Sequence, residues 1–234
     1  MQIFYSPDIT EKSCVLDENE SKHCIRVLRM GKGAFVNLID GKGNLYEGCI
    51  KEADPKACII DIISVIKDFE KKEYGLHIAI SPLKNSGRFE WFIEKSVEIG
   101  IDEITPLICR NTEKPAIKTD RINNLIISAM KQSVKAYRPV LNEPLSFANF
   151  VRLCLNGTRM IAHCNQKAGR SMISEIYSRG SYAVILIGPE GDFCEDEIGI
   201  ATTNGFIPVH LGPSRLRTET AGIAACHSIY FINQ

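Results

Sequence analysis

Short apolar runs separated by glycine-containing turns fill the first third of the chain. The runs lie at residues 3–5, 23–28, 34–39, 45–50 and 57–65. Turn signals stand between several of them, at residues 30–33, 40–43 and 53–55. Closely spaced strands joined by Gly-rich turns are typical of a small β-barrel or sandwich. The pattern therefore predicts a β domain here, and the charged residues 66–74 that follow are the expected linker.

Beyond this linker the pattern changes to an alternation of strands and helices. Strands are predicted at residues 76–80, 101–108, 159–163, 182–187 and 206–211. Apolar positions at helical spacing predict helices at residues 89–97, 120–135, 171–178, 195–203 and 218–232. Gly100 is the expected end of the first helix. Such alternation is typical of an α/β fold with a mostly parallel sheet covered by helices.

Two loops directly follow predicted strands and contain residues suited to binding. Residues 188–192 read G-P-E-G-D, and residues 211–220 read L-G-P-S-R-L-R-T-E-T. Ligands of open α/β sheets bind beyond the carboxyl ends of the strands, and glycine lets backbone groups approach a ligand closely. The two loops therefore predict a cleft lined by backbone, which suits a purine-like ring with a small polar chain.

Helix capping is an alternative explanation for some of the same residues. Asp192 with Glu195 three residues later resembles a capping box, and Thr218 is suited to cap the last helix. The acidic residues 195–197 would then simply oppose the helix dipole. From spacing alone, a ligand site and plain turn chemistry stay open as alternatives.

Charge is balanced over the chain but uneven along it. The 28 Lys and Arg residues equal the 28 Asp and Glu residues, so a whole-chain basic signal for nucleic acid is absent. Residues 21–33 nevertheless carry four basic side chains and no acid, and residues 110–138 carry seven against two. Such runs fit a phosphate backbone held at a defined place, although each run alone is also typical of a solvated face.

Several classes of protein and site are excluded by the pattern. No apolar run is long enough to cross a bilayer, and the first residues lack the basic and apolar regions of a signal peptide. The nine cysteines are an odd number without any C-x-x-C pair, so we expect buried, reduced thiols in a cytoplasmic protein and no metal. No phosphate loop or G-x-G-x-x-G motif is present.

Motifs spread over nearly the whole chain resemble those of one family. The stretch that begins at His23 is similar to H-x-x-x-V-L-R-x-x-x-G, and residues 94–106 match K-[AS]-x-E-[LI]-G followed by I-x-P. Gln132 and Ser133, with Arg138 and Pro139, fit a Q-[SC]…R…P element, and both loops described above match the family's cofactor loops. With these motifs the chain resembles the RsmE-type 16S ribosomal RNA (uracil-N3)-methyltransferases of the SPOUT class.

The resemblance implies a fold, a reaction and partners. We expect an RNA-binding, PUA-like β-barrel over residues 1–70 and a SPOUT α/β domain with a trefoil knot over residues 74–234. The implied enzyme is a homodimer with its active site near the dimer interface. It would use S-adenosyl-L-methionine to methylate N3 of a uridine in 16S rRNA of the small ribosomal subunit, without a metal and without a membrane.

The resemblance also implies which residues form the site. Cofactor binding is expected of Ala162, His163, Ile187, Gly188, Pro189, Glu190, Gly191, Leu211, Gly212, Leu216, Arg217 and Thr218. Uridine N3 attacks only after losing its proton, so a base or a cation must assist. Arg217 is the candidate cation, and Glu219 is the nearby carboxylate of the motif. RNA contacts are expected of Arg26, Arg29, Lys32, Arg88 and Arg138.

Two departures and two alternatives accompany this interpretation. The family usually has glycine where this chain has Asp192, and Lys131 replaces a more acidic or alanine-rich stretch before Gln132. One alternative is a SPOUT methyltransferase that acts on transfer RNA or on a ribose 2′-hydroxyl. The other is a ribosome-binding module without catalysis.

Overall fold

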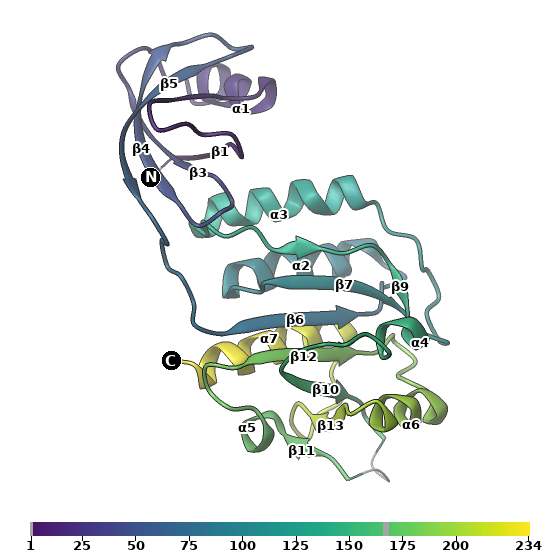
Figure 1. Ribbon diagram of the computed structural model, residues 1–234. Coiled ribbons are helices and arrows are strands. Elements are labelled where there is room, and N and C mark those ends of the chain that lie inside the picture. Colours follow the sequence, from purple (N-terminus) through teal and green to yellow (C-terminus); the bar gives the residue numbers. More distant parts are fainter. Residues whose placement is uncertain (1, 166–168) are drawn as a thin grey trace. The chain divides into compact units, whose positions relative to one another are not determined.

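The structure, a computed structural model, describes residues 2–165 and 169–234 and divides into two compact units. The first unit comprises Met1–Lys71 with Ile127–Arg138, and the second comprises Lys72–Ile126 with Pro139–Gln234. The chain thus leaves the first unit inside the charged segment 66–74. It later returns to that unit at residues 127–138, which the hydrophobic pattern did not predict. Each unit contains a β-sheet of its own (Figure 1).

A five-stranded sheet forms the first unit, in the order β1-β3-β4-β5-β2. Its strands are β1 (Ile3–Tyr5), β2 (Ser13–Val15), β3 (Phe35–Ile39), β4 (Leu45–Glu52) and β5 (Ile59–Ile66). Strand β1 pairs parallel with β3, and the other pairs are antiparallel. Side chains of Phe4, Leu38 and Ile60 are fully buried in its core together with Cys24 and Cys58. Most of the predicted strands of this unit are therefore confirmed.

The predicted strand at residues 23–28 is wrong, because this segment is helical. Helix α1 (Glu18–Lys22) continues into a π-helical turn, η1 (His23–Val27). Asp17 starts the helix by accepting a hydrogen bond from the Glu20 backbone N–H at 2.8 Å. The branched apolar residues of the segment favour a strand on propensity, but the cap and the acidic first turn decide its structure.

A mostly parallel sheet forms the second unit, as predicted. Its order is β11-β13-β10-β12-β6-β7-β8, and neighbouring strands in this order pair in parallel throughout the described residues. The strands are β6 (Gly75–Ile80), β7 (Glu103–Ile108), β8 (Val140–Leu141), β10 (Thr158–Ala162), β11 (Ser171–Met172), β12 (Tyr182–Ile187) and β13 (Ile207–His210). The short β9 (Leu145–Ser146) pairs with β7 outside this path. A trefoil knot in this unit stays a prediction.

Helices cover both faces of this sheet (Figure 1). On one face, helices α2 (Ser86–Ile99) and α7 (Thr218–Ile232) pack against each other, and α7 lies on β6 and β12. On the opposite face lie α4 (Phe147–Phe150) and α6 (Glu195–Thr203). Val184 and Leu186 of β12 pack in the α4–α6 core. Side chains alternate along a strand, so the equally buried Ile185 faces α7.

The remaining helices match the predicted ones in part. Helix α3 spans Thr119–Ser133, and α2 ends at Gly100, whose φ of 113° is the left-handed conformation that glycine adopts without strain. The helix predicted at 171–178 shrinks to β11 followed by α5 (Ile173–Ile176). The cysteines are free, and most are buried or half-buried, but Cys154 and Cys164 are exposed, contrary to expectation.

Contact between α7 and α2 depends on Gly222. A Cβ added there would lie 2.6 Å from a ring carbon of Phe92 and 2.9 Å from Ile80 Cδ1. Gly199, in α6, has open space at the same position, with nothing within 4 Å. The two glycines therefore provide a matched pair for testing this contact.

We expect Gly222→Ala to lower the free energy of unfolding of the second unit by about 1–2 kcal/mol, because overpacking outweighs the better helix propensity of alanine. Gly199→Ala should raise it by about 0.5–1 kcal/mol, since only the propensity changes. Urea unfolding followed by the fluorescence of the sole tryptophan, Trp91 on α2, reports this unit. Equal effects of the two substitutions would contradict the packing described.

Candidate functional site

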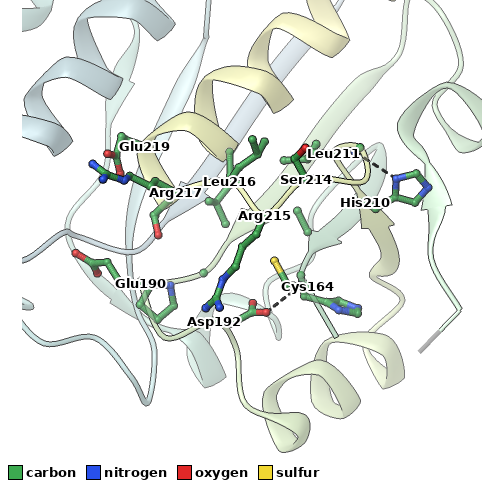
Figure 2. A pocket seen from close by; sticks show the side chains of 18 of the residues that line it. Cys164, Glu190, Asp192, His210, Leu211, Ser214, Arg215, Leu216, Arg217 and Glu219 are labelled. Atoms are coloured by element: carbon green, nitrogen blue, oxygen red, sulfur yellow. Dashed lines mark hydrogen bonds between the residues drawn. The ribbon is translucent and has the colours of Figure 1, made fainter. Parts of the chain in front are cut away.

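A cavity of about 400 Å³ opens at the carboxyl ends of β10, β12 and β13 (Figure 2). Strand β10 lies between the other two, and in register Ala162 is opposite both Ile187 and Val209. The three strands therefore end at one level of the sheet. Their following loops form the walls of the cavity, as the general rule for parallel sheets predicts.

The loop after β10 forms a third wall of the cavity. The two glycine-containing motifs alone do not predict it. The motifs follow β12 and β13, which are successive strands along the chain but not neighbours in the sheet. The intervening β10 contributes Ala162, His163 and Cys164 to the cavity. The motifs thus lie on either side of a third segment, which carries a buried histidine.

Nearly all residues predicted to bind the cofactor line this cavity. These are Ala162, His163, Ile187, Gly188, Pro189, Glu190, Leu211, Gly212, Leu216, Arg217 and Thr218. Gly191 is not among the lining residues. Both candidate catalytic residues, Arg217 and Glu219, line it too, and so does Arg88 from α2.

Sequence reasoning missed further lining residues. Cys164, Arg170, His210 and Ala221 lie outside the two predicted loops, whereas Asp192, Ser214 and Arg215 lie within them but are not among the predicted contacts. Ser214, Arg215 and Ala221 lie inside or beside the second motif, so the motif itself was the available signal. Arg170 and His210 had no comparable signal, because only the fold brings them to the cavity.

Asp192 connects two of the cavity walls. Its φ of 64° lies in the left-handed region, which glycine favours and aspartate tolerates better than most residues. Its carboxylate accepts a hydrogen bond from the backbone N–H of Cys164 at 2.8 Å (Figure 2) and a second one, also at 2.8 Å, from the backbone N–H of Phe193. Asp192 therefore fits a position where the family that this chain resembles usually has glycine. Its hydrogen bond to Cys164 also connects the loops that follow β12 and β10.

The capping explanation of the two loops is wrong in its details. Cys194, not Asp192, precedes α6, and its backbone N–H donates to Glu197 Oε2 at 3.0 Å. Arg217, not Thr218, is the cap residue of α7. Asp192 and Thr218 are therefore not helix caps, although the Asp192 carboxylate is engaged in local backbone hydrogen bonds at this turn.

Glu219 places a buried carboxylate at the first turn of α7. The residue is 5% exposed, and its Oε1 lies 3.7 Å from Nε of Arg88. Its Oε2 is buried and has no hydrogen-bond partner among the described residues. A buried polar atom without a partner is costly, so this oxygen is a candidate contact for a ligand.

His163 is the second buried group with unmet hydrogen-bonding capacity. It is 5% exposed, and neither ring nitrogen has a partner within the described chain. Burial lowers the pKa of His163, Asp192 opposes this change, and the positive charge of Arg170 adds to it. The imidazole is therefore neutral at pH 7 and offers the cavity one donor and one acceptor.

The predicted RNA contacts divide between the two units. Arg26, Arg29, Lys32 and Arg138 are exposed on the first unit. Arg29 has a φ of 55°, so the turn after η1 fixes its backbone in an uncommon conformation. Arg88 belongs instead to the cavity of the second unit, where it contacts Glu219.

Ion pairs cancel much of the predicted basic run at residues 110–138. Arg110, Arg121, Lys131 and Lys135 pair with Asp196, Glu90, Glu20 and Glu70, respectively. These acids come from distant segments, so the excess of charge counted along the chain overstates the excess in space. Lys114 and Lys118 have no ion-pair partner among the described residues.

Metal and membrane sites receive no support from the part of the chain that the structure describes. No group of three or more His, Cys, Asp or Glu side chains is arranged to hold a metal ion. None of the helices combines the length and apolarity needed to cross a membrane.

Comparison with known proteins identifies the family. A model described as an RNA methyltransferase domain matches residues 70–230, and one described as an RNA methyltransferase PUA domain matches residues 16–63. The chain belongs to the RNA methyltransferase family. The cavity described above lies within the first of these matches.

Relatives of this RNA methyltransferase match over nearly its full length. "Ribosomal RNA small subunit methyltransferase E" of Synechocystis sp. is 29% identical over 94% of this chain and 74% of its own. A crystal structure of a probable rRNA-methyltransferase from Porphyromonas gingivalis is 39% identical, with a TM-score of 0.93, covering 100% of this chain and 98% of that one. Ribosomal RNA small subunit methyltransferase E from Neisseria gonorrhoeae, bound to S-adenosyl methionine, is 25% identical, with a TM-score of 0.90, covering 99% and 98%.

The lowered pKa of His163 predicts how stability depends on pH in this RNA methyltransferase. Because the folded-state pKa lies below the unfolded value of about 6.5, the unfolded chain binds more protons as pH falls below neutrality. His163 therefore destabilises the fold increasingly between pH 7 and its folded pKa. His163→Gln should weaken the loss of stability on acidification, measured by urea unfolding from pH 8 to pH 5. Identical pH profiles for His163→Gln and the wild type would contradict this assignment.

Proposed function

We propose that this chain transfers a methyl group from S-adenosyl-L-methionine to N3 of a uridine in 16S rRNA of the small ribosomal subunit. The observation that carries the proposal is the cavity at the ends of β10, β12 and β13, where both motif loops meet two buried, unpartnered polar groups. The names of the relatives, and the S-adenosyl methionine bound by one of them, support the choice of ligand and substrate.

The cavity fits this cofactor in size and chemistry. About 400 Å³ lies within the usual range for small-molecule sites. The buried His163 ring and Glu219 Oε2 have no hydrogen-bond partners among the described residues, and a polar ligand can supply them. Gly212 has a φ of 110°, and nothing lies within 4 Å of an added Cβ. The backbone of the loop after β13 is therefore open to close approach by a ligand.

The residues expected to hold the cofactor come from all three loops: Ala162 and His163, residues 187–191, and Leu211, Gly212, Leu216, Arg217 and Thr218. When bound, S-adenosylmethionine supplies an electrophilic methyl group on a sulfonium centre. The protein contributes position and electrostatics. Glu190 is fixed for this purpose, because its Oε1 accepts a hydrogen bond from the Lys84 backbone N–H at 3.2 Å.

Activation of the uridine requires removal of the proton on N3. In our proposal, Glu219 accepts this proton on Oε2, and Arg217 stabilises the negative charge that spreads onto the flanking carbonyl oxygens. N3 then bonds to the methyl carbon as the carbon–sulfur bond breaks. Arg88 holds the other carboxylate oxygen of Glu219, at 3.7 Å, and so orients the base.

The first unit serves as the RNA-binding part of the enzyme in this proposal. Residues 1–70, the PUA-like domain, make up most of this unit, which also includes residues 127–138, and the catalytic domain lies within residues 74–234. Exposed Arg26, Arg29 and Lys32 contact phosphates, and Arg138 and Arg88 add contacts to the substrate. Phosphate contacts of this kind set register without reading sequence. The enzyme acts as a cytoplasmic homodimer.

Methyl transfer to small ribosomal subunits that lack the modification tests the proposal directly. With labelled S-adenosylmethionine and mass analysis of the nucleosides, we expect N3-methyluridine at a single site. Label in transfer RNA or on a ribose 2′-hydroxyl would replace the proposed substrate by another RNA. Absence of cofactor binding would overturn the proposal in favour of a ribosome-binding module without catalysis.

Replacing Glu219 tests the proposed proton transfer. Glu219→Gln keeps the shape and the acceptor facing Arg88 but removes the base, so kcat should fall roughly 10²–10⁴-fold. Activity should recover partly at high pH, because solution hydroxide then removes the N3 proton. The same chemical change at the exposed Glu195, outside the cavity, is the control and should leave kcat unchanged. A kcat of Glu219→Gln equal to that of wild type would assign Glu219 a structural role.

A further inference from the structure

A second cavity, of about 310 Å³, opens beside the first turn of α2. Its floor is apolar and buried, formed by Pro82, Leu83, Phe89 and Ile122. Its rim is cationic, formed by Lys114, Lys118 and Arg121. The lysines belong to a segment between β7 and α3 that has no regular secondary structure.

This second cavity is distinct from the cofactor cavity but adjoins it. The two share no lining residue, yet Arg88 lines one and its neighbour Phe89 lines the other. Lys84, which precedes α2, donates its backbone N–H to Glu190 of the cofactor loop. Consecutive helix residues point about 100° apart, so the cavities lie on neighbouring sides of the same helical turn.

Positive charge at the rim is not cancelled within the protein. Arg121 forms a bidentate ion pair with Glu90, at 2.7 and 2.8 Å, and Glu90 is the acidic residue among those that line the cavity. Lys114 and Lys118 are exposed and have no ion-pair partner in the described chain. Four other basic residues of the same run form ion pairs with acids, whereas this rim carries Lys114, Lys118 and Arg121 against one acid among the lining residues, Glu90, which also attracts Lys118.

An apolar floor beneath a cationic rim matches the chemistry of a nucleotide. The volume is at the low end of small-molecule sites, which suits one base better than a whole cofactor. Proteins recognise RNA largely through single-stranded bases that are splayed out of the stack, with lysines on the phosphates. An enzyme that draws a target base out of its stack also exposes the neighbouring nucleotide.

We propose that the second cavity binds an unstacked nucleotide next to the target uridine of the RNA substrate. The base occupies the apolar floor, and its phosphates contact Lys114 and Lys118. The inference rests on the proposed function, because the ligand is part of the same RNA. It adds a binding site in the catalytic unit to the contacts already expected of the first unit.

RNA binding by the paired variant Lys114→Ala/Lys118→Ala tests the phosphate contacts. Its dissociation constant for small-subunit RNA should rise roughly tenfold or more at 0.1 M salt, and the slope of log affinity against log salt should flatten by about 2. Arg152→Ala/Arg179→Ala is the control, since it removes the same charge from exposed positions of the same unit. Equal slopes and affinities for the two paired variants would overturn the proposal.

Filling the cavity without changing charge tests the base site. Ala116 lines the cavity and is exposed, so Ala116→Trp should block it without disturbing the buried floor. RNA carrying 4-thiouridine next to the target should crosslink under ultraviolet light to residues 114–122 in the wild type, and at least fivefold less in Ala116→Trp. Crosslinks confined to other segments, or unaffected by Ala116→Trp, would overturn the proposal.

Cofactor binding and oligomeric state separate this inference from its alternatives. Calorimetry with S-adenosylmethionine should give unchanged affinity in both cavity variants. If the wild type methylates RNA and the cavity variants behave like the control, only the proposed role of the second cavity is refuted. If the wild type binds no RNA, the proposed function itself is refuted. Weaker self-association of Ala116→Trp in sedimentation, with unchanged RNA affinity, would assign the cavity to a second copy of the chain and overturn the proposal.

Discussion

Parallel pairing of β10 with both β12 and β13 is the constraint on which the site depends. The pairing sets Ala162 opposite Ile187 and Val209, so three strands end together and their loops share one cavity. A shift of one residue in the pairing of β10 with β12 or with β13 would move every side chain of β10 to the opposite face of the sheet. The buried rows on both faces, with Ile161 on one and Met160 on the other, hold the register.

Packing of α7 on α2 carries this constraint into the electrostatics of the site. Gly222 lets the two helices approach, and Glu219 lies one turn earlier on the same helix. The approach brings Arg88 of α2 to the Glu219 carboxylate, and it leaves Oε2 buried with no hydrogen-bond partner in the described part of the chain. An apolar contact in the core therefore determines the charge environment of a polar group in the cavity.

Charge shows how far a linear count differs from a spatial one. The run at residues 110–138 looks strongly basic along the sequence, but ion pairs with acids from distant segments cancel four of its charges. Two of the three that remain, Lys114 and Lys118, line a cavity that no motif marks. The net charge of this region can therefore be judged only when each basic residue is considered together with the acid that it pairs with.

The sequence by itself determined the parallel sheet, the C-terminal end of α2, both ends of α6 and α7, and, through the family motifs, more than half of the residues that line the cofactor cavity. It could do so because strand and helix periods are local, and because the two glycine-containing motifs directly follow strands. Local propensity failed where a cap overrode it, as at His23–Val27, and at Asp192, the expected cap, which adopts a left-handed turn conformation while Cys194 precedes α6. Only the tertiary structure decided that β10 lies between β12 and β13, that Arg170 and His210 reach the cavity, and that Glu219 meets Arg88. These facts depend on which distant segments become neighbours, and that information is held in the packing of the whole unit.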